Sequence, residues 1–466
     1  MKALLVMMVI LFLSVTVEGQ KYGSKRVILK SNLDSFNILP FWPQKMPIVA
    51  NDTSAFGTNF YKTVFMIKTD MDSVSIRFDP SKKPYKQTTL IEIAAKGKSQ
   101  FIAINFNEMI VEFSPAYINA NTGKVQFDIP ETYELANVLY SLTKSSAKDS
   151  NRTFKRSSYY EHVLAYFKPY LNHPLIKKLE FGNDASGAAN YYNFRENSFC
   201  FQFEKDRVIR NNQYNIVNGE MKNNLFQKLL PLANDFVRKS DFRRFYSTNI
   251  KYYQSQIEQA KHIMPVKQIW DWLENNFKNK FQSYRVVFSP LIWGSHSAQQ
   301  FWWAENLNKM FGETVMFVGG PEIFDIDSSL SEKQKEGLAS GMVFTEIDHN
   351  YINPVSEKYK NTIEIAFKDI NKWLSADGDA QLYQSPMAVF NEYMTHAAFV
   401  LYCFDNLSIP DFEFSKARRE GLMIKKRKYF RFKEFDDELL HLYKTRSKDQ
   451  KLEDLFDDIL KWATTQ

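Results

Sequence analysis

The residues best suited to chemistry stand in one pentad, from Thr345 to His349, which reads Thr-Glu-Ile-Asp-His. Zinc-dependent hydrolases often place two His residues at the first and fifth positions of such a helical pentad, with a Glu at the second position as general base. The two His side chains lie about 40° apart around the helix axis and can therefore reach one metal ion. This sequence keeps Glu346 and His349 but has Thr345 at the first position, on a helix that Ser331 and Glu332 are predicted to begin. The pattern predicts a general base and one metal ligand, with a second ligand replaced.

A second run carries another pair of candidate ligands. Ser385 followed by Pro386 predicts the start of a helix, because Ser is a favoured N-cap and Pro a favoured first helical residue. Glu392 and His396 stand four residues apart on this helix and so share one face. Glu392 is a candidate third ligand, and His396 or Asp348 could substitute for the ligand missing at the pentad. The same spacing also suits ordinary hydrogen-bonded histidines near a domain core, and this alternative stays open.

The elements that must position these residues change type along the chain. From 26 to 129 the apolar residues recur every second position, which predicts short strands at 63–67, 74–78, 90–93, 101–106, 110–113 and 125–127. After residue 130 the spacing becomes helical and predicts helices at 131–142, 159–171, 225–237, 241–254 and 266–277, a loop at 144–158 and a buried strand at 284–288. We expect an α+β protein with an N-terminal antiparallel β domain (20–128) and a larger helix-rich domain (129–466).

Several segments of the second domain occur in an order that resembles a known family. They are 129–137 (Ile-Pro-Glu-Thr-Tyr-Glu-Leu-Ala-Asn), Tyr159-Tyr160, His173-Pro174, 242–246 (Phe-Arg-Arg-Phe-Tyr), Tyr252-Tyr253, 288–291 (Phe-Ser-Pro-Leu) with Gly294 and His296, the pentad with Asn353-Pro354, and 391–393 (Asn-Glu-Tyr). This run resembles an uncharacterised family of secreted bacterial proteins, a domain of unknown function with a gluzincin-like metallopeptidase pattern.

The resemblance implies a zincin-like fold for 129–466 and a role for each matching residue. Glu346 stands at the position of the general base, and His349 and Glu392 stand at positions of metal ligands. The strand at 286–289, which ends at Ser289, resembles the edge strand of a zincin substrate cleft, where a peptide can add as a further strand. His296 and Thr345 would face the same cleft, although His296 also suits an ordinary surface loop.

Thr345 decides between three readings of function. A neutral hydroxyl binds zinc weakly, and a catalytic zinc site normally has three protein ligands. We therefore favour a non-catalytic, degenerate relative that binds a peptide or protein in the former active-site cleft, with zinc weakly bound or absent. The first alternative is an active zinc peptidase with a substitute ligand and Glu346 as general base. The second is a purely structural exported protein whose own aromatic residues fill the cleft, which predicts no cavity beside Glu346.

The start of the chain predicts export. Lys2, the apolar run at 4–17 and the small residue Gly19 fit a cleavable signal peptide at 1–19, so we expect a secreted or periplasmic protein. The apolar run is too short to span a bilayer, and no later run reaches about 18 apolar residues, so no transmembrane segment is expected. Two cysteines, Cys200 and Cys403, exclude a disulfide-built scaffold and leave either one long-range bridge or two buried thiols.

Composition narrows the class of partner. The 466 residues include 60 Lys and Arg against 53 Asp and Glu, a net charge of +7, which is mild for this length. The basic cluster from Lys425 to Lys433 is followed at once by acidic residues, which favours a solvated face over a nucleic-acid site. We expect a peptide or protein partner and no nucleic acid.

Overall fold

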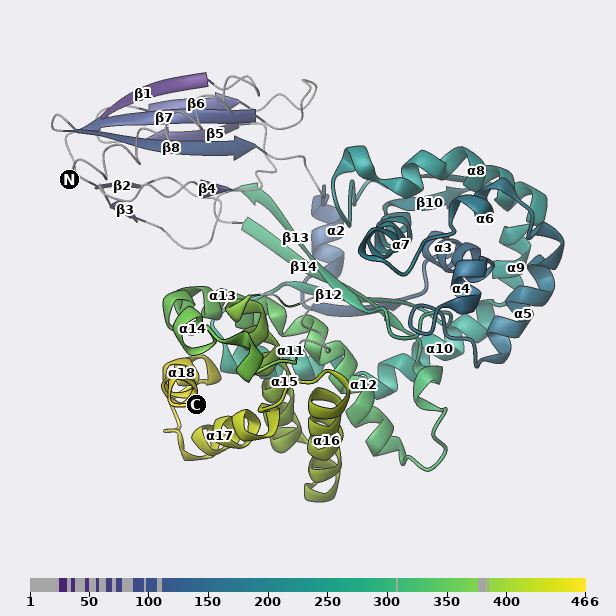
Figure 1. The fold of residues 1–466 in the computed structure, drawn as a ribbon. Helices are drawn as coiled ribbons and strands as arrows, with labels where there is room; N and C mark the ends of the chain where they lie inside the picture. The colour runs from purple at the N-terminus through teal and green to yellow at the C-terminus, as the bar shows by residue number, and fades with distance from the viewer. Residues whose placement is uncertain are drawn as a thin grey trace. The chain divides into compact units, whose positions relative to one another are not determined.

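The computed structural model describes backbone and side chains for residues 111–303, 311–375, 383 and 385–466, and backbone alone for the strands within 25–106 and for 304–306 and 309–310 (Figure 1). The described residues form two compact units. The first contains those up to Ala120 together with Asn211–Asn223 and Phe301–Gly312, and the second contains Asn121–Arg210, Asn224–Gln300 and those from Glu313 onward. The predicted signal peptide, 1–19, lies outside the described residues.

The first unit contains a four-stranded sheet in the order β1-β7-β8-β4. Its strands are β1 (Lys25–Ser31), β4 (Phe56–Gly57), β7 (Gln87–Ala95) and β8 (Lys98–Phe106), beside the antiparallel pairs β2 (Ser35–Asn37) with β3 (Pro47–Val49) and β5 (Val64–Lys68) with β6 (Ser73–Arg77). The sequence predicted an antiparallel sheet. β7 and β8 are antiparallel, but β1 runs parallel to β7 and β4 parallel to β8. A parallel neighbour needs a long crossover, and the chain between β1 and β7 provides one.

Aromatic packing explains why three separate segments share the first unit. The Phe113 ring stacks on Tyr117 with centroids 4.7 Å apart and meets Phe311 edge-on at 5.4 Å. The hydroxyls of Tyr117 and Tyr214 lie 2.7 Å apart. Such aromatic pairs bury large areas with specific geometry, so they hold 211–223 and 301–312 against the N-terminal segment.

The second unit is built on a sheet in the order β13-β14-β12-β9. The strands are β9 (Lys124–Asp128), β12 (Ser283–Ser289), β13 (Ser297–Asn306) and β14 (Lys309–Gly319), and the first unit takes the β13–β14 segment from Phe301 to Gly312. β12 is parallel to both β14 and β9, and its residues Tyr284, Val286, Val287 and Phe288 are fully buried. The predicted edge strand is therefore wrong: β12 is central, as a continuous apolar run indicates, and β13 lies at the edge. The predicted domain boundary after 128 also differs, because β9 pairs within the second unit.

Helices surround this sheet, with α3–α9 gathered on one side of β12 and α12–α18 on the other (Figure 1). Their bounds are α3 (Glu131–Ser141), α4 (Lys144–Lys148), α5 (Ser158–Phe167), α6 (Pro174–Lys178), α7 (Ala185–Asn197), α8 (Leu225–Ser240), α9 (Phe242–Thr248), α10 (Ile250–Ile263), α11 (Val266–Asn276), α12 (Glu332–Ile347), α13 (His349–Lys358), α14 (Lys360–Ala366), α15 (Pro386–Asn406), α16 (Ile409–Gly421), α17 (Phe432–Thr445) and α18 (Phe456–Thr464). The short helix α2 (Pro115–Asn121) precedes β9, and the hairpin of β10 (Phe201–Glu204) and β11 (Arg207–Arg210) follows α7. The predicted α+β fold class is confirmed. The predicted loop at 144–158 is wrong in part, because α4 lies within it.

Two helices position the candidate site, and both begin where the sequence predicts. Ser331 caps α12 in a reciprocal capping box with Gln334, and the Ser385 hydroxyl accepts the Ala388 backbone N–H at the start of α15. α15 is the buried centre of the C-terminal helices and packs against α12, α13, α14, α16 and α17. Its Cys403 and the remote Cys200 are both buried and are not joined in a disulfide, which agrees with the two-thiol alternative.

None of the helices in the described part of the chain is both long enough and apolar enough to cross a membrane.

Candidate functional site

A cavity of about 890 Å³ lies wholly within the second unit, among α12, α15, α16 and the segment that follows α16. Six of the residues predicted from the sequence line it: His296, Thr345, Glu346, His349, Glu392 and His396. Ser289 does not. It is fully buried at the end of β12, where its hydroxyl accepts the Leu291 backbone N–H at 3.1 Å. His349, Glu392 and His396, which the sequence spacing singled out as candidate ligands, therefore lie at one cavity. Ser289 instead belongs to the core.

The pentad spans a junction between two helices. α12 ends at Ile347, Asp348 caps it with its N–H bonded to the Phe344 carbonyl at 2.9 Å, and α13 begins at His349. The sequence placed all five residues on one helix. Asp348, a predicted substitute ligand, is fully buried and does not line the cavity.

The Thr345 hydroxyl is hydrogen-bonded to the backbone of its own helix. It donates there, with Oγ1 lying 3.0 Å from the Gly341 carbonyl oxygen and 3.3 Å from that of Met342. This is the usual back-bonding of Thr inside a helix. The first position of the pentad thus contributes a side chain to the cavity wall but no ligand.

Arg427 occupies the space between the two α15 candidates. Its Nη2 donates to Glu392 Oε2 at 2.8 Å, and its Nη1 lies against His396 Nε2. Glu392 Oε2 is also 3.6 Å from His396 Nε2. Burial alone would raise the pKa of Glu392, but His396 and the Arg427 charge outweigh it and lower that pKa to about 2. The carboxylate therefore carries a full negative charge that Arg427 neutralises.

His349 stands apart from this pair. Its side chain is 34% exposed, and its Nε2 lies 3.8 Å from Glu392 Oε1, beyond a hydrogen bond. Its Nδ1 lies 3.4 Å from the Thr395 hydroxyl. His349 faces the carboxylate that Arg427 already holds.

These residues do not fit a zinc ion. Zinc needs three ligand atoms about 2.0–2.2 Å from one point. His349, Glu392 and His396 do not form a group with ligand atoms all within 4.8 Å of one another, and the Arg427 guanidinium lies against Glu392 Oε2 and His396 Nε2. A cation of the protein itself therefore lies among the candidate ligands.

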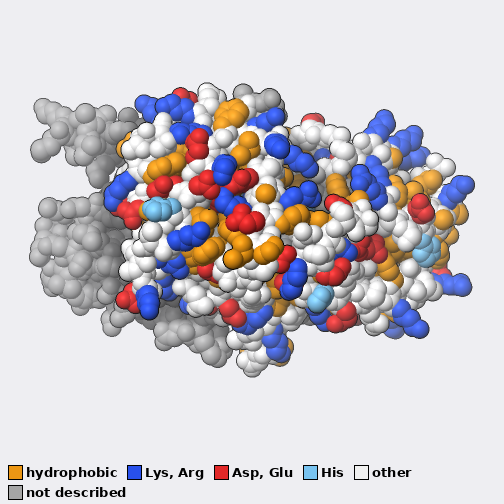
Figure 2. All heavy atoms as spheres, turned by 90° about the horizontal axis from the view of Figure 1, so that it is seen from below, with side chains coloured by type: hydrophobic (Ala, Val, Ile, Leu, Met, Phe, Trp, Pro, Cys, Tyr) orange, Lys and Arg blue, Asp and Glu red, His pale blue; other side chains and the backbone are white. Residues whose placement is uncertain are grey.

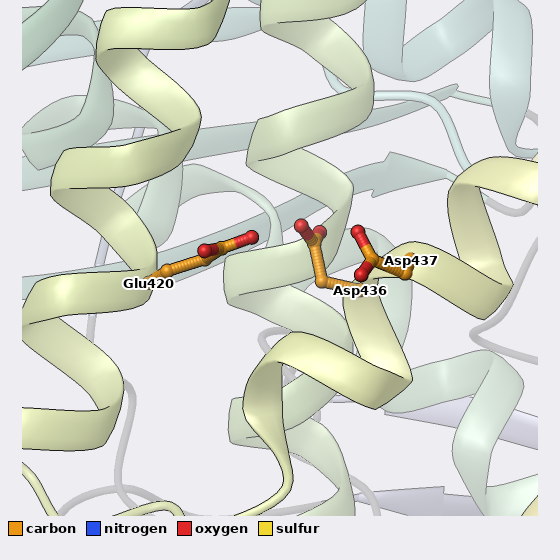
Figure 3. Close-up of side chains that lie close together, drawn as sticks. All are labelled: Glu420, Asp436 and Asp437. Carbon is orange, nitrogen blue, oxygen red and sulfur yellow. The ribbon is translucent and has the colours of Figure 1, made fainter.

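The metal-like group that does exist in the described residues is also filled by a side chain. Glu420 on α16 and Asp436 and Asp437 on α17 point toward one another (Figure 3). The Lys416 ammonium lies among them, 2.5 Å from Glu420 Oε1 and 2.8 Å from oxygens of both aspartates. We interpret this cluster as a buried structural ion pair.

Glu346 lines the cavity as an acid whose charge is disfavoured. Burial, and then the charges of Glu392 and Glu196, raise its pKa to about 8. Arg195, which is buried and bonded to Ser295, acts in the opposite direction. At neutral pH the Glu346 carboxyl is therefore largely protonated, which suits a hydrogen-bond donor better than a general base.

His296 also lines the cavity, from the loop before β13. The Gly319 backbone N–H donates to its Nδ1 at 3.3 Å, and burial together with Arg195 lowers its pKa to about 4. It is therefore a neutral side chain of the cavity wall, with its Nδ1 acting as an acceptor.

The residues that the sequence analysis missed are the basic ones. Arg418 and Arg419 on α16 and Lys425, Lys426 and Arg427 beyond it all line the cavity, although 425–433 was interpreted as a solvated face. Leu422–Lys426 forms a π-helix, a rare conformation that often marks functional sites. Basic and acidic side chains are interspersed over the face of the molecule that Figure 2 shows. The missed signal was local: the first three basic residues of 425–433 come within nine residues of Arg418 and Arg419 in the sequence.

Comparison with protein-family models, with curated protein sequences and with solved structures finds no match for this chain.

Proposed function

We propose that this chain is an exported, non-catalytic relative of gluzincin-type zinc metallopeptidases that binds a peptide or a protein segment in its cavity. The observation that carries the proposal is the Arg427 guanidinium, paired with Glu392 and set against His396. Thr345 adds to it, because its hydroxyl is bonded within α12. With neither a free carboxylate nor a first-position ligand, water activation by zinc has no support from these side chains.

The cavity supports binding. Its volume of about 890 Å³ falls in the range of ligand-binding clefts, roughly 300–1,000 Å³. Its wall combines apolar residues such as Leu338, Met342 and Phe399 with the polar group around Glu392. The alternative of a purely structural protein expected no cavity beside Glu346, so this space speaks against it. The export signal at 1–19 remains part of the proposal.

Metal analysis tests the loss of catalysis. After dialysis in micromolar zinc, we expect the purified chain to retain less than about a tenth of an equivalent, and the double variant Thr345→His with Arg427→Met to approach one. Lys448→Met, at an exposed lysine remote from the cavity wall, is the matched control for loss of a cation. A parent that holds one zinc and cleaves peptides, with cleavage lost in Glu346→Gln, would establish the active-peptidase alternative.

Peptide binding is tested separately. A pool of fluorescent peptides of about eight residues should bind the parent, and Leu338→Trp should weaken binding at least about tenfold by filling the cavity. Leu171→Trp makes the same change at an exposed position outside the cavity and should bind as the parent does. Peptides that bind neither parent nor control would contradict the proposal.

A further inference from the structure

The polar wall of the cavity carries a surplus of positive charge. Five cations line it, Arg418, Arg419, Lys425, Lys426 and Arg427, against the two carboxyl groups of Glu346 and Glu392. Arg427 forms an ion pair with Glu392. Within the described part of the chain, no carboxylate lies at ion-pair distance from the other four cations. These four cations therefore have no direct ion pair with a side chain of that part.

Arg419 is the clearest case, because it is buried. Its side chain is 9% exposed, its guanidinium lies over the Phe399 ring at 4.3 Å, and its Nη1 lies 2.8 Å from His396 Nδ1. A guanidinium has five N–H donors, and this ring nitrogen is the one acceptor found for it among the described residues. Arg419 also lines the cavity. A buried cation without a carboxylate is unfavourable unless a ligand supplies one.

The histidine between the two arginines sharpens the argument. Arg419 faces its Nδ1 and Arg427 faces its Nε2. A neutral imidazole has one acceptor nitrogen, and the other carries a hydrogen. One guanidinium N–H therefore points at an N–H, so His396 cannot accept from both arginines. Among the described residues, Arg419 has no anionic acceptor with two oxygens, which would match the planar fork of its guanidinium.

We infer that the cavity recognises its peptide through a carboxylate, which pairs with Arg419 at the wall and is attracted by Lys425 and Lys426 at the exposed π-helix. This inference rests on the proposed function and names the ligand chemistry of the same site. The carboxylate could be the C-terminus of the peptide or an acidic side chain, since both offer the same pair of oxygens.

Three matched peptides of one neutral sequence separate these sources. The first has a free C-terminal carboxylate, the second is amidated and carries one Glu, and the third is amidated with Gln in place of that Glu. We expect the first or second to bind at least about tenfold tighter than the third, with the advantage shrinking between about 50 and 500 mM salt. Which of the two is preferred identifies the source.

The outcomes distinguish this inference from the proposed function. Equal binding of all three peptides, still lost in Leu338→Trp, overturns carboxylate recognition and leaves peptide binding standing. Binding of none of them contradicts the proposed function itself. A preference for a carboxylate peptide that salt does not weaken would also overturn the role given to the lysines.

Variants at the exposed Lys425 and Lys426 test these residues without disturbing the core, and a conservative variant tests the buried Arg419. The double variant Lys425→Ala with Lys426→Ala should weaken the preferred carboxylate peptide about tenfold and leave the Gln peptide unchanged. Lys448→Ala, the matched control, should change neither. Arg419→Lys keeps the charge but loses the fork, so its preference should fall while circular dichroism stays that of the parent. An unchanged preference in both the lysine double variant and Arg419→Lys overturns the inference.

Discussion

Replacing Lys416 by methionine should destabilise the protein strongly and in a pH-dependent way. Methionine keeps the length and apolar stem of the side chain but removes the ammonium that lies 2.8 Å from Asp436 Oδ2 and 2.8 Å from Asp437 Oδ1. Asp436 is fully buried, so it cannot recover its charge partner from solvent. Breaking a buried pair by removing one partner lowers the free energy of unfolding by about 3–5 kcal/mol, which is the loss expected near pH 8.

The pH dependence follows from the carboxyl left behind. Burial raises the pKa of Asp436 to about 7, even though Lys416 lowers it. A carboxyl with a raised folded-state pKa contributes stability that is full below its unfolded pKa and is lost as pH rises through the folded value. Without Lys416 that folded pKa rises further, so the penalty grows with pH. Near pH 5 Asp436 is protonated in both proteins, and the loss falls to about 1–2 kcal/mol, the value of the lost hydrogen bonds.

Urea unfolding followed by tryptophan fluorescence at the two pH values measures both effects. Lys433→Met is the matched control, because Lys433 also pairs with Asp437 at 2.8 Å but is 57% exposed, so its loss should cost under about 1 kcal/mol. Millimolar Ca²⁺ should stabilise Lys416→Met, whose three carboxylates then lack the Lys416 ammonium, and should not stabilise the parent. Equal penalties for the two lysine variants, or a Lys416 penalty that does not change with pH, would refute the reasoning.

Three further predictions concern other parts of the second unit. Glu134 is fully buried, and burial raises its pKa to about 7. The free energy of unfolding of Glu134→Gln should therefore increase by about 1–2 kcal/mol relative to that of the parent between about pH 6 and pH 8.5, as measured by urea unfolding at each pH. A difference that does not change with pH would contradict the titration. A Cβ at Gly341 would lie 2.0 Å from a nitrogen of the Arg419 guanidinium, so Gly341→Ala should lower the free energy of unfolding by about 1–3 kcal/mol. A Cβ at Gly421 would meet nothing within 4 Å, so Gly421→Ala should be neutral or stabilising. Similar losses in both variants would contradict this packing. Cys200 and Cys403 should not react with a thiol reagent in the native protein but should both react after denaturation without reductant, and an absence of reactive thiol there would reveal a disulfide.

Local signals predicted the helices of the site well. The Ser331 and Ser385 caps act over three residues, and both structural starts agree with them. The place of β12 in its sheet depends on pairing with β9 and β14, which are remote in sequence, so its apolar run indicated burial but not which strands flank it. The pairing of β1 with β7 escaped prediction for the same reason.

The same distinction holds at the candidate site. Periodicity placed Glu392 and His396 on one helical face, and both line the cavity with Glu346 and His349. No periodicity relates Glu392 to Arg427, which reaches it from beyond α16. Spacing in the sequence thus identified the residues that resemble metal ligands. It could not identify the Arg427 charge beside them, because only tertiary packing brings Arg427 to Glu392.

The position of Arg427 in the cavity depends on the number of residues in the π-helix after α16. A π-turn holds one residue more than an α-turn, and each residue of a helix turns the chain by about 100°. Deleting one residue from Leu422–Lys426 would convert it to an ordinary helical turn and rotate Arg427 away from Glu392. A single residue gained or lost at this turn would thus separate Arg427 from Glu392 and leave the carboxylate without this partner, so the charge of the cavity wall depends on chain length as well as on residue type.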